Sequence, residues 1–247
     1  MGTSSSHRGP SNRSPLVPPW ADANPEKPLP PTPEVPRFKG FRTEFGKAVA
    51  TGASLAPALK KYSSEATGGS ELGPRRFGPA YTAGASLAQA LAGEPAPEGS
   101  KLDLASLAGQ PLDRAAQAIA EALAPENADA DKIRAAIQDA LPEVLGTEGV
   151  FDPDAIGPDQ IAALLVEFFA RILFQEISAV AGDAWKKAPS VQRSTAAENE
   201  LLEIVRAAMD KHLSPRLSGD FKTLTRDELQ RLEQGALEDI WRAWRDE

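Results

Sequence analysis

The chain has 247 residues, 22 of them proline and none of them cysteine, and its formal net charge is −8. Without cysteine there are no disulfides, zinc–thiolate sites or cysteine nucleophiles. The two histidines, His7 and His212, lie far apart in the sequence, which disfavours histidine-rich metal centres and Ser-His-Asp triads. Composition therefore favours a soluble, mostly helical interaction protein.

The charge is unevenly distributed along the chain. Residues 1–78 hold 11 basic and 6 acidic residues, whereas residues 79–247 hold 16 basic and 29 acidic ones. An acidic body with so weakly basic a front is a poor match to nucleic-acid modules, so no direct nucleic-acid binding is expected. The most apolar stretch, 161–181, is interrupted by charged side chains that are costly in lipid, and the N-terminus lacks a secretory apolar region. We therefore expect a cytoplasmic protein without a membrane segment.

Residues 1–40 contain ten prolines and are predicted to form a long, disordered, Pro-rich N-terminal arm. A short apolar island interrupts this arm. It consists of Leu16, Val17, Pro18, Pro19 and Trp20. An exposed tryptophan in a polar tail is the kind of anchor that partner proteins bury, so the island is a candidate docking motif. The alternative is a solvated tail with a chance tryptophan.

Residues 41–93 are predicted to be a Gly/Ala-rich helical segment that binds a partner, and residues 94–100 a linker. Phe41 and Phe45 begin a helical spacing that Gly52 can end. A second short helix is expected over 53–62, and a third helix of small residues runs through Leu87 and Leu91.

Residues 101–247 are predicted to form an α-helical bundle domain, which makes the fold class all-α. Apolar stripes predict helices after Pro111, over about 129–145 and over 158–182, with Pro142 expected to kink or shorten the second. Two S/T-x-x-E capping boxes, at 195–198 and 225–228, are each predicted to start a further helix. Trp241 and Trp244 fit core packing better than a base-stacking platform, and Glu167 is spaced to pair with Arg171.

Catalytic and metal motifs are missing from the sequence. It contains no G-x-x-x-x-G-K-[ST], G-x-G-x-x-G, H-E-x-x-H or G-x-S-x-G pattern. Asp152, Asp154 and Asp159 lie near glycines, but they do not fit the EF-hand spacing and are better read as helix caps or solvated loop residues. We therefore expect no enzyme activity, no catalytic residue, no metal and no bound cofactor.

The start of the chain offers one distinctive nucleophile. Removal of Met1 would leave an α-amine on Gly2. The pKa of an α-amine is about 7.7–8.0, against about 10.4 for lysine, so a substantial fraction is neutral near pH 7.5. The same residues match a myristoylation pattern, and small residues also begin many ordinary tails.

Several stretches resemble the QatB family, the second component of four-gene Qat anti-phage defence systems. The resemblance lies in residues 1–5, 14–21, 41–43 and 67–70, in the string Gly73-Pro74-Arg75-Arg76-Phe77-Gly78, and in residues 111–113 and 120–125. It spans most of the chain. The N-terminal strings are its most specific part, because Ala/Leu-rich helices resemble one another easily.

The resemblance implies three partners: a QueC-like enzyme (QatC), an ATPase (QatA) and a TatD-like nuclease (QatD). QueC enzymes activate a 7-deazaguanine carboxylate with ATP, and a protein amine can replace ammonia as the acceptor. We expect the chain to dock on the QueC-like enzyme and to receive a 7-deazaguanine adduct at Gly2. The predicted partner-binding residues are Thr3, Ser4, Ser5, Leu16, Val17, Pro18, Pro19, Trp20, Phe41, Arg75, Arg76 and Phe77.

Two other functions stay open at this point. The first is an unmodified scaffold that holds the ATPase, the QueC-like enzyme and the nuclease together. The second is a nucleic-acid-binding accessory that uses Arg75, Arg76, Lys60 and Lys61 for phosphates. The second predicts an affinity that falls steeply with salt.

Overall fold

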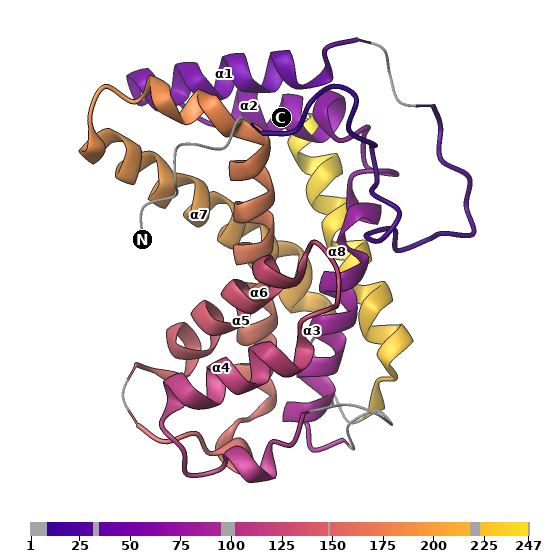
Figure 1. Cartoon of the computed structure of the whole chain (residues 1–247), viewed down its shortest axis with the longest axis vertical. Coiled ribbons are helices and arrows are strands. Elements are labelled where there is room, and N and C mark those ends of the chain that lie inside the picture. Colours follow the sequence, from indigo (N-terminus) through magenta and orange to yellow (C-terminus); the bar gives the residue numbers. More distant parts are fainter. Residues whose placement is uncertain (1–8, 32–34, 95–101, 148, 218–222, 247) are drawn as a thin grey trace. The chain divides into compact units, whose positions relative to one another are not determined.

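The computed structural model describes residues 9–31, 35–94, 102–147, 149–217 and 223–246 (Figure 1). Over these ranges the protein forms eight α-helices and no β-strand, which confirms the all-α prediction. The chain divides into two compact units, each built from separate stretches of sequence.

Unit 1 comprises Met1–Arg76, Leu173–Val205 and Leu237–Glu247. Its own helices are α1 (Arg37–Thr51) and α2 (Ala56–Lys61), followed by a π-helical turn at Tyr62–Ala66. Helix α1 packs against α2, the π-helical turn and a 3-10 segment at Gly182–Lys187. Long-range packing of this kind is what stabilises short helices, which are marginal alone.

The core of unit 1 is aromatic. The rings of Phe45 and Trp185 meet edge-on with centroids 4.7 Å apart, and Tyr62 lies 5.4 Å from Phe41 and 5.7 Å from Trp241. The four tryptophans of the chain, at positions 20, 185, 241 and 244, all belong to unit 1. Tryptophan fluorescence therefore reports on this unit alone.

The packing of Trp241 accounts for Thr67 and Gly73, two residues in the strings that resemble the QatB family. The indole Nε1 of Trp241 donates a hydrogen bond to Thr67 Oγ1 (2.8 Å), and that hydroxyl donates to the backbone oxygen of Tyr62 (2.9 Å). The same indole lies so close to Gly73 that a Cβ there would overlap it. Thr67 and Gly73 are thus needed to bury the tryptophan with its donor satisfied.

Unit 2 comprises Phe77–Ile172 and Arg206–Ala236. It contains α3 (Gly78–Leu91), α4 (Leu112–Leu123) and α5 (Ala130–Leu145), with α4 packed against α5 and also touching α3 (Figure 1). Helices α6 (Pro158–Ala181), α7 (Val191–Leu213) and α8 (Arg226–Asp246) each contribute one part of their length to each unit. The core of unit 2 is largely aliphatic, with fully buried Ile119, Ile137, Leu164 and Leu165.

Two helix starts were predicted from capping boxes, and one prediction was right. Thr225 caps α8 as predicted, because its backbone N–H donates to Glu228 Oε2 (2.8 Å) and its Oγ1 accepts from the Glu228 N–H (3.3 Å). The prediction at Thr195 was wrong. Helix α7 begins earlier, at Val191, where Ser190 Oγ accepts from the Arg193 N–H (3.2 Å).

Pro142 does not end α5, which continues to Leu145. The proline lies in the last turn, so it removes one helical hydrogen bond at a place where few residues follow. Gly146 then ends the helix with a positive φ of 96°, and its N–H donates to the Pro142 oxygen (3.0 Å).

Candidate partner interface

The N-terminal segment bonds to the rest of unit 1 through residues 10–27, which differs from the expected disordered arm. Leu16, Val17 and Ala21 are buried, with 5%, 1% and 2% of their surface exposed. Leu16 and Val17 of the apolar island thus pack onto their own unit. Arginine side chains donate hydrogen bonds to the backbone oxygens of the arm. These bonds replace the backbone–backbone hydrogen bonds of regular secondary structure, which a proline-rich segment cannot form. We name residues 9–31 the docked arm.

Arg75 holds the inner part of the docked arm. Its Nε and Nη2 donate to the two carboxylate oxygens of Asp22 (2.9 and 2.7 Å), and Nη2 also approaches the backbone oxygens of Asn24 (2.7 Å) and Lys27 (2.8 Å). The Arg75 backbone oxygen accepts from the Ala23 N–H (2.8 Å). Both charged side chains are almost fully buried, at 6% and 7% exposed. A paired two-point contact of this kind combines strength with fixed geometry.

Asp22 is ionised in this pair. Burial by itself would raise the pKa of Asp22, but hydrogen bonds from Arg75 and from the Asn24 N–H, with the charge of Arg75, hold that pKa below its ordinary value. The carboxylate and the guanidinium are therefore a charged pair at neutral pH.

Two arginines of α1 hold the outer part of the docked arm. Arg42 donates to the backbone oxygens of Pro10 (2.8 Å) and Val180 (2.8 Å). Arg37 donates from Nη2 to the backbone oxygens of Ser14 (2.6 Å) and Pro15 (3.2 Å). These contacts reach residues 10–15, just before the buried Leu16.

The two α1 arginines are paired less completely than Arg75. Both guanidinium groups stack near the Phe38 ring, at 4.6 Å for Arg37 and 5.1 Å for Arg42. Arg37 is buried, and its Nε and Nη1 have no hydrogen-bond partner among the described residues. Burial, together with the nearby charge of Arg76, lowers the pKa of Arg37 from its ordinary value. The hydrogen bonds that both arginines donate to the outer part of the arm thus go to neutral backbone oxygens.

The predicted partner-binding residues separate into exposed and buried ones. Trp20 is half exposed and Pro19 is exposed, so both side chains face solvent beside the buried Leu16 and Val17. Pro18 is half-buried. Gly2, Thr3, Ser4 and Ser5 lie outside the described residues.

The other predicted partner-binding residues are built into the two units. Phe41 is fully buried in the aromatic core of unit 1, and Phe77 is buried in unit 2 beside Tyr81. Arg76 forms an ion pair with Glu176 (3.0 Å). Lys61 pairs with Glu65, so three of the four basic residues of the nucleic-acid alternative are already neutralised by carboxylates.

Sequence reasoning missed Asp22, Arg37 and Arg42 as residues that hold the arm. One signal was present: Arg37 begins α1, where the helix dipole disfavours a positive charge. Another interaction must therefore stabilise the Arg37 cation, and the structure shows its hydrogen bonds to the backbone oxygens of Ser14 and Pro15.

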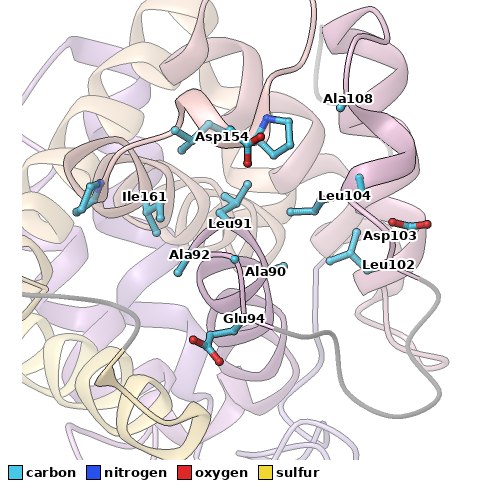
Figure 2. Close-up of a pocket in the computed structure, with 15 residues that line it drawn as sticks. Ala90, Leu91, Ala92, Glu94, Leu102, Asp103, Leu104, Ala108, Asp154 and Ile161 are labelled. Atoms are coloured by element: carbon cyan, nitrogen blue, oxygen red, sulfur yellow. The ribbon is translucent and has the colours of Figure 1, made fainter.

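Unit 2 contains a cavity of about 950 Å³ between the end of α3, residues 102–108 and residues 153–161. Leu91 and Leu104 point toward one another across it, while the carboxylates of Glu94 and Asp103 point away from its centre (Figure 2). The described lining is mostly apolar and contains no basic side chain.

Unit 2 also buries two carboxyl groups. Glu167 pairs with Arg171 (2.6 Å), as its spacing predicted, and also accepts two bonds from Arg206 (2.6 and 2.9 Å). Burial raises the pKa of Glu167, and the two arginines overcome that effect and lower it. Glu233 is fully buried, and its two oxygens have no hydrogen-bond partner among the described residues. Desolvation therefore raises the pKa of Glu233 well above its ordinary value.

Metal-binding clusters and membrane-spanning helices are both absent from the part of the chain that the structure describes. Over the described residues, no group of three or more His, Cys, Asp or Glu side chains is arranged to hold a metal ion. Asp152 instead accepts from the Asp154 N–H (3.2 Å), as an expected cap. Among the described helices, none combines the length and apolarity needed to cross a membrane.

Comparison with known proteins identifies the family. A family model described as "Qat anti-phage system associated protein QatB" matches residues 68–244, which is more than half of the chain. The matched range includes Gly73, Arg75 and Trp241. Searches of curated proteins and of solved structures found no match. The chain belongs to the QatB family and is thus a component associated with the Qat anti-phage system.

Proposed function

We propose that this protein is a non-catalytic component that binds the QueC-like enzyme of the Qat system and presents the Gly2 amine as the acceptor of a 7-deazaguanine group. The family supports the setting. The observation that carries the proposal is the docked arm, because three arginines hold residues 10–27 on unit 1 and so fix the place from which the acceptor end of the chain departs.

The proposed reaction belongs to the partner enzyme. The carboxylate of the 7-deazaguanine attacks the α-phosphorus of ATP and displaces pyrophosphate, which gives an acyl adenylate. The neutral amine of Gly2 attacks the acyl carbon, AMP leaves, and the amine proton passes to solvent, so that an amide remains. This chain supplies only the amine, and glycine places no side chain beside it. The adduct is a covalent modification and not a cofactor.

Trp20 is the proposed anchor for the partner. It is half exposed although its neighbours Leu16 and Val17 are buried, so it is held in place without being covered. Exposed tryptophans on rigid supports are frequent binding hot spots. The ATPase and the nuclease of the system are further proposed partners, and we assign no binding residues to them.

The test is the mass of the N-terminal peptide after incubation with the purified QueC-like enzyme, ATP and 7-carboxy-7-deazaguanine. We expect an amide adduct on Gly2 that requires all three components. Trp20→Ala should weaken binding to the enzyme by at least about tenfold, as expected for a hot spot. Val35→Ala is the matched control, because Val35 is an exposed apolar residue that also precedes α1.

An unmodified Gly2 in a stable complex with all reactants present would overturn the acceptor role. That result would favour the scaffold, in which the arm only tethers partners. Binding that falls steeply with salt in a mobility-shift assay with DNA or RNA would instead favour the nucleic-acid alternative.

A further inference from the structure

We infer that Arg37 and Arg42 are positioning residues that shorten the tether of the acceptor amine by holding residues 10–15 on α1. This inference rests on the proposed function. The two side chains contact the backbone oxygens of Pro10, Ser14 and Pro15, and they touch no reacting group.

The docked arm has an inner and an outer part that are held differently. The inner part has buried Leu16 and Val17 and the buried pair of Asp22 with Arg75. The outer part, residues 9–15, has no buried side chain and is held through its backbone by Arg37 and Arg42. Loss of these two arginines should therefore free the outer part and leave the inner part in place.

Tether length follows from this difference. With the outer part held, Gly2 lies seven positions before Gly9, and with it released, Gly2 lies fourteen positions before Leu16. A fully extended chain of these lengths reaches about 25 Å and about 50 Å. The effective concentration of a tethered group falls as the −3/2 power of tether length, so release should lower it about threefold.

The release itself is tested without any partner. Arg13 lies in the outer part and is exposed, so trypsin can cut after it once the surrounding chain leaves the surface. We expect cleavage after Arg13 to be about tenfold faster or more in the Arg37→Gln, Arg42→Gln double variant, because it loses the hydrogen bonds that hold this segment. Lys39→Gln is the matched control, since it removes an exposed cation from the same helix.

The positioning role is tested by single-turnover modification of Gly2 with the QueC-like enzyme in saturating amount. We expect the double variant to react about threefold more slowly at unchanged affinity for the enzyme. Seven Gly/Ser residues inserted between Arg8 and Gly9 should slow the wild-type reaction by the same factor while cleavage after Arg13 stays slow. A purely structural role of the arginines would not be reproduced by that insertion.

Each result decides a different point. Unchanged cleavage after Arg13 in the double variant would overturn the hold of Arg37 and Arg42 on the outer part. Faster cleavage with an unchanged rate of modification would overturn the positioning role but keep the acceptor. The absence of any adduct on the wild-type protein would overturn the proposed function, and this inference with it.

Discussion

Asp22 in unit 1 and Glu233 in unit 2 are both buried carboxyl groups, yet their pKa values move in opposite directions. Asp22 receives two hydrogen bonds from Arg75 and its pKa is lowered. Glu233 lies against Gly84, where a Cβ would stand 2.7 Å from a Glu233 carboxylate oxygen, and burial raises the pKa of Glu233. Burial disfavours the charge in both places, and only a donor reverses that effect.

The comparison shows what buried polarity does in each unit. In unit 1 the buried pair of Asp22 and Arg75 attaches the docked arm to the rest of the unit. These two charges therefore stabilise a contact between residues that are far apart in the sequence. In unit 2 Glu167 has two arginine partners, whereas Glu233 has none among the described residues. The two units should therefore respond differently to loss of a partner and to pH.

The largest expected effect comes from making Asp22 resemble Glu233. Arg75→Met leaves the Asp22 carboxylate buried without its guanidinium partner and should lower the free energy of unfolding by about 3 kcal/mol. Urea denaturation followed by tryptophan fluorescence measures this effect in unit 1. With Asp22→Asn added, the loss should be smaller than the sum of the two single losses. A loss below about 1 kcal/mol would show that the pair acts as an exposed one does.

A smaller loss is expected for Glu167→Gln, about 2 kcal/mol at pH 7, because the three charge-assisted hydrogen bonds from Arg171 and Arg206 weaken. The folded-state pKa of Glu167 is lowered. Its stabilisation is therefore present above the unfolded pKa of about 4.3 and is lost as the pH falls through the folded value. Circular dichroism in urea at pH 7 and at acid pH should show a difference between variant and wild type that shrinks on acidification. A difference that grows on acidification would contradict the assignment.

The smallest effect has the opposite sign. Glu233→Met should stabilise the protein at pH 8 by about 1 kcal/mol. The reason is that an apolar side chain of similar size replaces a buried carboxyl group that is costly to ionise. The folded-state pKa of Glu233 is raised above its unfolded pKa. The free energy of unfolding of the wild type is therefore highest below the unfolded pKa and falls as the pH rises through the folded-state pKa. The advantage of the variant should thus grow with pH.

Glu126→Gln is the control for this measurement, because Glu126 is an exposed glutamate of the same unit. It should show no comparable dependence on pH. Equal stability of Glu233→Met and wild type across this range would mean that Glu233 has a donor or water that pairs it.

Local signals predicted the helices well, but they placed one helix start wrongly. The Thr225 box works because both of its hydrogen bonds form within one turn of chain. The Thr195 box has the same letters, but Ser190 lies earlier and already caps α7, so residues 195–198 lie inside the helix. A motif with a local mechanism is reliable only where no earlier residue performs the same task.

The candidate interface residues differ in exposure, which their sequence pattern does not show. Trp20 is exposed, as a docking residue must be, whereas Phe41 and Phe77 are buried and thus serve packing. Their apolar character was visible in the sequence, but which of these side chains would be covered was not. The contacts of Arg37 and Arg42 with the arm join residues that are 22 to 32 positions apart, and no periodicity reports such a pairing.

By itself the sequence determined the all-α class, most helices, the cap at Thr225 and the pair of Glu167 with Arg171, because each of these depends on residues within one or two turns. Only the tertiary structure decided that the proline-rich arm lies on unit 1, that Arg75 binds Asp22 across 53 residues, and that Glu233 is buried with no donor among the described residues. These features depend on contacts between residues that are far apart in the sequence. Such contacts form only when the whole chain packs and buries its apolar side chains.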